Sequence, residues 1–385
     1  MEKEKKKDKN KKKNKKKILI IDGNLLARKT FYKFQNLSTE LTNREVKIFN
    51  KELIQNNNKK RVKISKISDG SGTNLRINSR GKIESKLEEI SQEQERVKIY
   101  TGVLYGMLRS ILLAKERFNI GKIIICYDPP PKISNQIRYE IESNYKNRKK
   151  DPETEIKFNY SIILAQAFFY KIGIEQVTST KFEADDLLHY YTHNKFKNRK
   201  CIVLTNDHDL FQVLEKDRVE MLSIGSDYSL YTEDDFRKDF QNISPKQYRD
   251  VLALGGCSTD NVSGVPGISK HAAATLISKA GDIKSLLKHY KEIEIPKRSK
   301  TAIEKEINND LENLKLSLKL VSLYGLNKHL KSDLLPKKTQ NSPEMCYKHA
   351  IFLLKLLKFR SFLTESSKYS LKSLIGVKGE TDHER

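Results

Sequence analysis

Residues Val203–Gln212 read VLTNDHDLFQ, and this stretch decides the fold. It begins inside an apolar, β-branched run, Cys201–Leu204, which is typical of a buried strand. The run stops at Thr205, and two carboxylates, Asp207 and Asp209, follow it before an apolar, helix-like segment. In an open α/β sheet, the residues just beyond the carboxyl ends of parallel strands face one crevice. The stretch therefore predicts acidic side chains at such an edge.

Two other strand-like runs end in the same way. Residues 18–21 (ILII) lead into Asp22, and residues 123–127 (IIICY) lead into Asp128. A further acidic group opens a helical pattern about 15 residues before the central strand, the spacing of a βαβ unit; its members are Glu183, Asp185 and Asp186. Carboxylates at close range raise each other's pKa unless cations compensate their charge. The pattern therefore predicts a divalent-metal site.

The composition indicates a polyanionic partner. The chain has 385 residues and a net charge of +25, so nucleic acid is the first expectation. Part of that charge lies in residues 2–17, where eleven Lys and three acids are typical of a solvated, disordered tail. No apolar run is long enough to predict a membrane span. The four cysteines are far apart, which indicates buried thiols in a reducing compartment.

The order of the patterns predicts a doubly wound α/β fold followed by helices. Strands are expected near residues 17–21, 122–127, 173–178, 200–205 and 219–224, with helical stretches between them. Residues 36–95 are polar and predict a long, mostly disordered, low-complexity insertion. Beyond residue 243, helices starting at Ser244 and at Lys270 flank a glycine-rich loop, whose backbone N–H groups could grip phosphate.

A basic, aromatic segment follows Asp128 and three prolines, which break regular structure. Composition alone favours a solvated helix face for it. Its position beside the predicted metal crevice favours a flap that binds phosphate and stacks on exposed bases. Its key members are Arg138, Tyr145, Lys146, Arg148 and Lys149.

Together these motifs resemble those of the structure-specific 5′ nucleases, a family of 5′-to-3′ exonucleases and flap endonucleases with a PIN-like α/β core. Asp22 and Asp128 resemble the family's first two strand-end aspartates. Residues 183–186 (EADD) and 207–212 (D-x-D-x-x-Q) resemble its acidic motifs, and residues 259–268 resemble its helix-three-turn-helix. The resemblance covers most of residues 18–365.

The resemblance implies a PIN-like (resolvase-like), mostly parallel sheet with a helical arch and a separate all-helical domain. The expected parts are a Lys-rich tail at 1–17, a catalytic domain at 18–242 with an arch at 132–158, a helix-three-turn-helix domain at 243–340, and closing helices and a tail at 341–385.

The resemblance also implies a role for each site residue. Two Mg²⁺ or Mn²⁺ ions about 4 Å apart are assigned to these ligands: Asp22, Asp128, Glu183 and Asp185 for the first, Asp207, Asp209 and Asp260 for the second, and Asp186 in the outer shell. Lys146, helped by Arg148 or Lys149, steers the scissile phosphate. DNA contacts are expected from Arg138, Tyr145, Gly264, Val265, Gly267, Ile268 and Lys270, with a K⁺ ion at the helix-three-turn-helix as in many members.

The implied function is 5′-to-3′ exonuclease and flap endonuclease activity in RNA-primer removal and DNA repair. The implied substrates are 5′ flaps, nicked or gapped duplex and RNA-primed DNA, bound by a monomer that works with replication and repair proteins. The expected location is intracellular, and a nucleus, a plastid or mitochondrion, and a nucleoid all stay open.

Three departures from the family pattern matter. Cys257 stands where the family usually has an aspartate, so one acid near the second ion is missing. Ser269 stands at a usual glycine, which shifts the following basic residue to Lys270. The family's arch arginine falls nearest Lys149, which leaves its assignment ambiguous with Arg148.

Two alternatives come from other classes. One is a non-catalytic DNA-structure binder disabled at Cys257, against which the other carboxylates count. The second is a PIN-type ribonuclease, against which the arch and the helix-three-turn-helix count.

Overall fold

The computed structural model describes residues 16–54, 76–77, 83–84, 96–129, 137–146, 151–225, 228–324 and 327–377. The chain forms two compact units. Unit 1 contains residues 1–26, 119–149 and 177–336, and unit 2 contains residues 27–118, 150–176 and 337–385. Every carboxylate of the predicted metal site belongs to unit 1.

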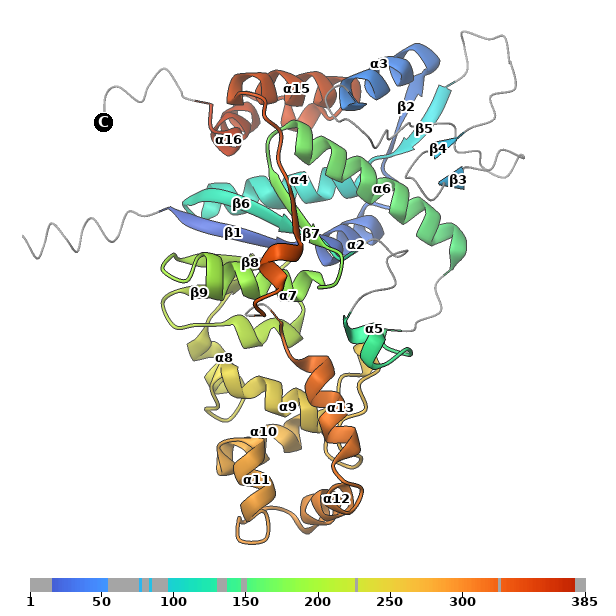
Figure 1. Cartoon of the computed structure of the whole chain (residues 1–385). Helices are drawn as coiled ribbons and strands as arrows, with labels where there is room; N and C mark the ends of the chain where they lie inside the picture. Colours follow the sequence, from blue (N-terminus) through green and yellow to red (C-terminus); the bar gives the residue numbers. More distant parts are fainter. Residues whose placement is uncertain are drawn as a thin grey trace, which may run out of the picture. The chain divides into compact units, whose positions relative to one another are not determined.

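The main sheet has seven strands among the described residues, in the order β10, β9, β8, β1, β6, β7, β11. Their bounds are β1 (Lys17–Asp22), β6 (Ile120–Cys126), β7 (Glu175–Ser179), β8 (Cys201–Leu204), β9 (Val219–Leu222), β10 (Leu230–Tyr231) and β11 (Leu334–Lys337). Figure 1 shows β1, β6, β8 and β9 side by side. The predicted strands are thus present, each shifted by at most a few residues.

The central strand β1 runs parallel to both of its neighbours. Asp22 at its end is in register with Cys126 of β6, and Ile21 is in register with Leu204 of β8. β9 continues the parallel set beyond β8, and β10 is antiparallel to β9. The predicted mostly parallel α/β sheet is confirmed, and the ends of β1, β6 and β8 share one edge.

Helices complete unit 1. α7 (Ala184–Tyr190) packs on β1 and β6 and continues as one π-helical turn, Tyr191–Lys195. The all-helical part shown in yellow and orange in Figure 1 follows; it comprises α8 (Glu233–Asp239), α9 (Tyr248–Gly255), α10 (Lys270–Ala280), α11 (Ile283–His289), α12 (Lys297–Asn308), α13 (Glu312–Val321) and α14 (Leu330–Asp333). α9 packs against α10 and α13. The two helices predicted to flank the glycine-rich loop are therefore present, the first preceded by a 3-10 turn, Pro245–Gln247.

Unit 2 is mainly helical. Helix α2 (Gly23–Lys33) leads into it, and its own elements are β2 (Ser38–Thr42), α3 (Asn43–Ile54), β5 (Arg96–Tyr100), α4 (Gly102–Arg117), α6 (Pro152–Lys171), α15 (Pro343–Leu356) and α16 (Glu365–Ile375), with the short pair β3 (Arg76–Ile77) and β4 (Ile83–Glu84). α6 packs against α4 and α15. Throughout the described ranges, the helices are too short or too polar to cross a membrane.

The prediction of a mostly disordered insertion is wrong for residues 38–54. β2 pairs antiparallel with β5, and α3 packs against β2. Few apolar residues suffice because they recur at the right spacing: Leu41, Val46 and Phe49 are all buried. Averaging the composition over residues 36–95 hides that spacing. Most of residues 55–95 lie outside the described part of the chain.

The predicted arch is described only in part. Its described elements are α5 (Ile137–Ile141), which belongs to unit 1, and the start of α6, which belongs to unit 2 and is capped by Asp151. Residues 130–136 and 147–150 lie outside the described residues, and these include Arg148 and Lys149. The four cysteines are free and buried, as the sequence predicts.

A tight turn in the glycine-rich loop provides a test of the fold. Gly264 has φ +65°, and a Cβ added there would lie 2.4 Å from the Gly256 nitrogen. Gly281 has φ +91°, but a Cβ there would meet nothing within 4 Å. We expect Gly281→Ala to lower the free energy of unfolding by about 1 to 2 kcal/mol through left-handed strain alone. Gly264→Ala should carry the same strain and lose roughly 1 to 3 kcal/mol more free energy of unfolding, because the added methyl group overlaps neighbouring backbone atoms. Urea titration measures both, and equal losses would contradict this account of the loop.

Candidate metal centre

The ends of β1 and β8 are joined through Thr205. Its hydroxyl donates to Asp22 Oδ2 at 3.3 Å and accepts from the Asp207 backbone N–H at 3.1 Å. Asp22 Oδ1 also accepts from the Leu25 N–H at 3.0 Å, which caps the first turn of α2. Asp22 and Asp207 are therefore held by the strand ends themselves.

The end of β6 is fixed to the same place. The Asp128 N–H donates to Asn24 Oδ1 at 3.1 Å, and Asp128 Oδ1 accepts from the Ala184 N–H at 2.9 Å. That second bond places the first turn of α7, with Glu183 and Asp185, at the strand ends. The order strand, carboxylate, helix predicted from the sequence thus brings these acids together.

The charges of these carboxylates are poorly compensated. Burial, together with the charges of Asp128 and Asp207, raises the pKa of Asp22 to about 7. Burial is also the main reason why the pKa values of four neighbours rise, and other carboxylates add to it in each case; these neighbours are Asp128, Asp185, Asp207 and Asp260. Protons and cations therefore compete for this cluster.

Glu183 is the exception. Burial alone would raise its pKa, but the charges of Lys146 and Arg138 outweigh burial, so the pKa is lowered. Its Oε1 accepts from Lys146 Nζ at 3.1 Å, and its Oε2 accepts from Arg138 Nη1 at 2.9 Å and from the Tyr145 hydroxyl at 3.1 Å. Glu183 is therefore ionised and surrounded by donors.

Arg138 is a buried structural residue, which corrects its predicted role in DNA binding. The side chain is 4% exposed and its five N–H groups are all used within the protein. They donate to both oxygens of Asp186, to Glu183, and to the backbone carbonyls of Leu320 and Ser322. This arrangement pins α5 to α7 and to the end of α13.

Asp186 takes part in the same network, and it shares Arg138 with Glu183. Its oxygens accept from Arg138, from the Glu183 N–H at 3.2 Å and from the Tyr324 N–H at 2.6 Å. With both oxygens occupied and the residue fully buried, Asp186 does not offer a free donor to an ion. Asp186 therefore supports Glu183 and α7, and its predicted outer-shell role stays a prediction.

Residues 144–146 dock onto the loop that carries Asp260. The Lys146 N–H donates to the Asp260 carbonyl at 3.3 Å, and Asn261 Nδ2 donates to the Asn144 carbonyl at 3.1 Å. Tyr145 is 2% exposed, and its hydroxyl oxygen, which donates to Glu183, also lies 3.3 Å from Asp260, so the ring is not placed to stack on a nucleotide. Lys146 Nζ lies 3.8 Å from Asp260, and its side chain is 28% exposed.

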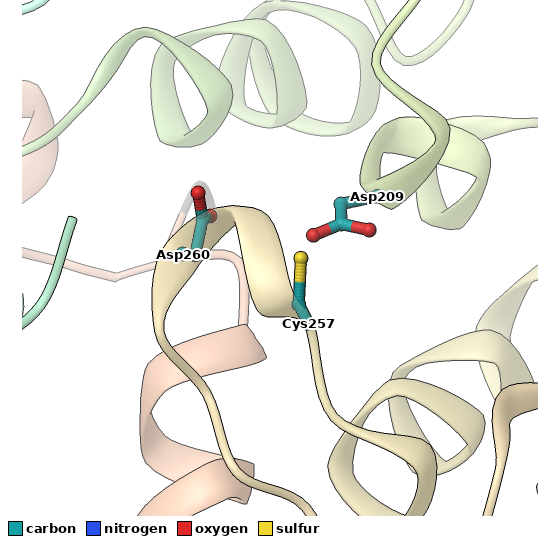
Figure 2. A group of neighbouring side chains, drawn as sticks. All are labelled: Asp209, Cys257 and Asp260. Atoms are coloured by element: carbon teal, nitrogen blue, oxygen red, sulfur yellow. The ribbon is translucent and has the colours of Figure 1, made fainter. Parts of the chain in front are cut away.

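A second group of donors lies beside the first. Oxygens of Asp209 and Asp260 and the sulfur of Cys257 all lie within 4.8 Å of one another. Figure 2 shows the sulfur pointing toward the carboxylate of Asp209. Lys270 Nζ lies 3.5 Å from Asp209 Oδ1, a contact that the sequence did not predict. This group brings Asp209 and Asp260 together as expected, and it adds a thiol.

The glycine-rich loop uses most of its predicted phosphate-binding N–H groups internally. Gly264 donates to Ser317 Oγ at 3.1 Å, Val265 to the Leu254 carbonyl at 2.8 Å, and Ile268 to the Val265 carbonyl at 3.0 Å. The prediction that these three N–H groups bind phosphate is therefore wrong, because each already donates within the protein. Gly267 is exposed and has φ +93°.

Two family models match this chain over consecutive segments. The model described as 5′-3′ exonuclease, N-terminal resolvase-like domain, matches residues 86–241. The model described as 5′-3′ exonuclease, C-terminal SAM fold, matches residues 243–340. Together they cover more than half of the sequence. The chain belongs to the 5′-3′ exonuclease family. As a member of that family, the protein is a nuclease that hydrolyses DNA.

Individual relatives support the same assignment. A 5′-3′ exonuclease of Halalkalibacterium halodurans is 33% identical over 172 residues, which cover 42% of this chain and 56% of the relative. One of Bacillus subtilis is 27% identical over 256 residues, which cover 65% and 82% respectively. The fold is similar to that of the bacteriophage T5 flap endonuclease solved with DNA and metal ions, with a TM-score of 0.52, 15% identity and coverage of 89% of this chain and 99% of that one.

The residues present in this 5′-3′ exonuclease fit divalent metal ions. Hard cations such as Mg²⁺ take carboxylate oxygens, and seven carboxylates meet here: Asp22, Asp128, Glu183, Asp185, Asp207, Asp209 and Asp260. The ammonium group of Lys146 lies 3.1 Å from Glu183, where its positive charge compensates part of the negative charge of the carboxylates. The donor chemistry and this ammonium group together support a cation site.

Sequence reasoning missed the residues that position the carboxylates. Asn24 and Thr205 orient Asp128, Asp22 and Asp207 through hydrogen bonds. Thr205 follows β8 directly, and Asn24 lies two residues beyond the end of β1, so their positions next to the strand ends were the available signal. The contacts of Arg138 had no local signal, because its partners are 45 to 184 residues away in sequence.

Removing the charge of Arg138 should destabilise the exonuclease strongly. In Arg138→Met, Asp186 and Glu183 keep their buried charges without the main compensating group. We expect the free energy of unfolding to fall by about 3 to 5 kcal/mol. Lys157→Met, which removes an exposed i,i+4 pair with Glu153, should change it by less than about 0.5 kcal/mol. Urea titration of both variants measures the difference, and a near-neutral Arg138→Met would refute the structural role.

Metal binding should depend on pH with a definite sign. Asp22 has a usual pKa of 3.8 and a folded pKa of about 7, so the folded protein holds this proton more tightly. Without metal, the stability from this proton is present below about pH 4 and is lost as the pH rises through about 7. Metal ions replace protons, so the rise in Tm caused by Mg²⁺ should grow over the same range.

Thermal melts with Mg²⁺ and with EDTA between pH 4 and 8 measure this effect. The side chain in Asp22→Asn cannot titrate, so the Tm of this variant in EDTA should change less with pH than that of the wild type. A Tm that climbs with pH in EDTA, or an equal slope in Asp22→Asn, would argue against the assignment.

Proposed function

We propose that this 5′-3′ exonuclease is a metal-dependent, structure-specific nuclease that cleaves DNA at 5′ ends and 5′ flaps. The observation that carries the proposal is the convergence of seven carboxylates around Lys146 at the ends of three parallel strands. Such a site can hold divalent ions against a phosphodiester, and a basic chain of +25 net charge favours a nucleic-acid substrate. The related fold of the bacteriophage T5 flap endonuclease was solved with DNA and metal ions.

The ion-holding residues fall into two groups. Asp22, Asp128 and Asp185 lie at the ends of β1 and β6 and on the first turn of α7, where an ion would be held with Glu183. Asp209 and Asp260 form the second group, and the charge of Asp207 interacts with members of both groups. When bound, Mg²⁺ or Mn²⁺ supplies activation of the attacking water and charge stabilisation at the leaving oxygen.

Lys146 has the exposure and charge needed to guide the phosphate. Nearby acids raise its pKa despite its burial, so the ammonium stays charged. Its side chain is 28% exposed, unlike Arg138 beside it. We propose that Lys146 exchanges Glu183 for a phosphate oxygen when ions and DNA bind, and so stabilises developing negative charge. Lys270, half-buried beside Asp209, is placed to contact a neighbouring phosphate.

The proposed cellular role is RNA-primer removal and DNA repair inside the cell. Cleavage at a flap or a nick depends on the structure of the DNA and not on its base sequence, so contacts to phosphates are sufficient for this role. Four free, buried cysteines suit a reducing compartment.

Cleavage of a 5′-labelled flap duplex and a nicked duplex tests the proposal. We expect short 5′ fragments in Mg²⁺ or Mn²⁺ and none in EDTA. Asp207→Ala should slow cleavage by at least about 100-fold, since even outer partners of metal ligands contribute 10- to 100-fold. Asp234→Ala, on the exposed surface of α8, is the matched control and should retain the rate. Fragments released equally in EDTA, or by Asp207→Ala, would defeat the proposal.

A further inference from the structure

We propose that Asp209, Cys257 and Asp260 form a mixed carboxylate–thiolate metal site that takes a borderline divalent ion, such as Zn²⁺ or Co²⁺, in preference to Mg²⁺. This inference rests on the proposed metal-dependent function and concerns the identity of one ion. It assigns Cys257 as a ligand, although a buried cysteine is ordinarily an inert packing residue.

The first support is geometry. One oxygen from each acid and the Cys257 sulfur lie within 4.8 Å of one another, and Figure 2 shows the sulfur directed at Asp209. In a tetrahedral zinc site, bonds of about 2.3 Å to sulfur and 2.1 Å to oxygen place the donors about 3.5 Å apart. Side-chain rotations that bring the three donors closer together by up to about 1 Å would therefore place them around one ion.

The second support is the surroundings of the sulfur. Cys257 is 3% exposed, yet it lines a small cavity together with Asp185, Asp209 and Asp260. The rest of the lining is polar and apolar, from Arg138, Tyr145, Gln212, Val262, Leu320, Val321 and Leu323. A cysteine that only filled the core would face apolar side chains on all sides. The Thr259 hydroxyl lies 2.8 Å from the sulfur and can donate a hydrogen bond to a thiolate.

The third support is the rigidity of the loop. Cys257 and Val262 exchange two backbone hydrogen bonds, each of 2.9 Å, and the Asp260 N–H donates to the Cys257 carbonyl at 3.2 Å. Gly256 makes the turn into this loop with φ +72°, and a Cβ there would lie 2.6 Å from the Val262 carbonyl oxygen. The relative positions of Cys257 and Asp260 are therefore set before any ion arrives.

The chemistry follows from the donor atoms. Thiolate selects zinc-like ions, whereas carboxylates alone suit Mg²⁺ and Mn²⁺. Binding forms a bond between the ion and sulfur and releases the thiol proton to solvent, so no electron is transferred. Lys270, whose ammonium lies 3.5 Å from Asp209, must move aside for the ion.

Titration of the full-length protein with Co²⁺ provides the test, without oxygen and without added thiols. We expect a sulfur-to-cobalt charge-transfer band in the near ultraviolet, growing to one equivalent, which Zn²⁺ abolishes and an equal concentration of Mg²⁺ does not. Cys257→Ser should lose the band and bind Co²⁺ at least about tenfold more weakly. Cys346→Ser removes a buried thiol of unit 2 and should keep the band.

Cys257→Asp exchanges sulfur for oxygen and serves if Cys257→Ser does not fold. It should lack the band and reach half-maximal flap cleavage at a lower Mg²⁺ concentration. A wild-type protein without the band, or a band that persists in either Cys257 variant, overturns the proposal. Because the band does not depend on cleavage, a protein with the band but without cleavage would refute the nuclease role and leave this site standing. Cleavage without the band would refute this metal site and leave the nuclease role standing.

Discussion

Repulsion among carboxylates is the constraint on which the rest of unit 1 depends. Parallel pairing of β1 with β6 and β8 places Asp22, Asp128 and Asp207 at one edge, and α7 adds Glu183 and Asp185. Burial makes this repulsion costly, because charges out of water interact more strongly. Burial is the main cause of the raised pKa of Asp22 and its neighbours, and the charges of the nearby carboxylates add to it. A fold with this edge needs positive charge from some source.

The structure divides that positive charge between permanent and exchangeable groups. Arg138 is permanent: its five donors are all used, it is buried, and it fixes α5, α7 and α13 to one another. Lys146 and Lys270 are exchangeable, since each is partly exposed and makes longer contacts with the acids. Buried ion pairs that are fully hydrogen-bonded tend to specify one arrangement. Exposed ammonium groups can give way to metal ions and to phosphate. We propose that stability and function rest on different cations, Arg138 for stability and Lys146 and Lys270 for function.

Cys257 changes the donor atoms of the second metal group without changing the backbone of the loop that carries them. The loop that carries it is closed by backbone hydrogen bonds and by glycines with positive φ, which do not depend on the side chain at 257. A sulfur can therefore replace an oxygen there with little structural cost. What changes is the preference for the ion, because a soft thiolate donor favours zinc-like ions over Mg²⁺. Within the 5′-3′ exonuclease family, this chain therefore allows the effect of the protein backbone to be studied separately from the effect of the bound ion.

The sequence by itself determined the sheet, the strand-end acids and the family. Apolar β-branched runs followed by aspartates predict parallel strands that share an edge, because the rule depends only on local periodicity and chain order. Tertiary structure alone decided which charged residues face the metal site. Arg138 and Asp186 have the composition of a site but are buried, because their partners include Leu320 at the end of α13 and Tyr324 just beyond it. Tyr145 is also buried, but its hydroxyl stays beside Glu183 and Asp260. Residues 38–54 likewise gain order only by pairing with β5, more than 50 residues away. Such long-range partners leave no trace in a local pattern, and burial then decides whether a charge binds a ligand or supports the fold.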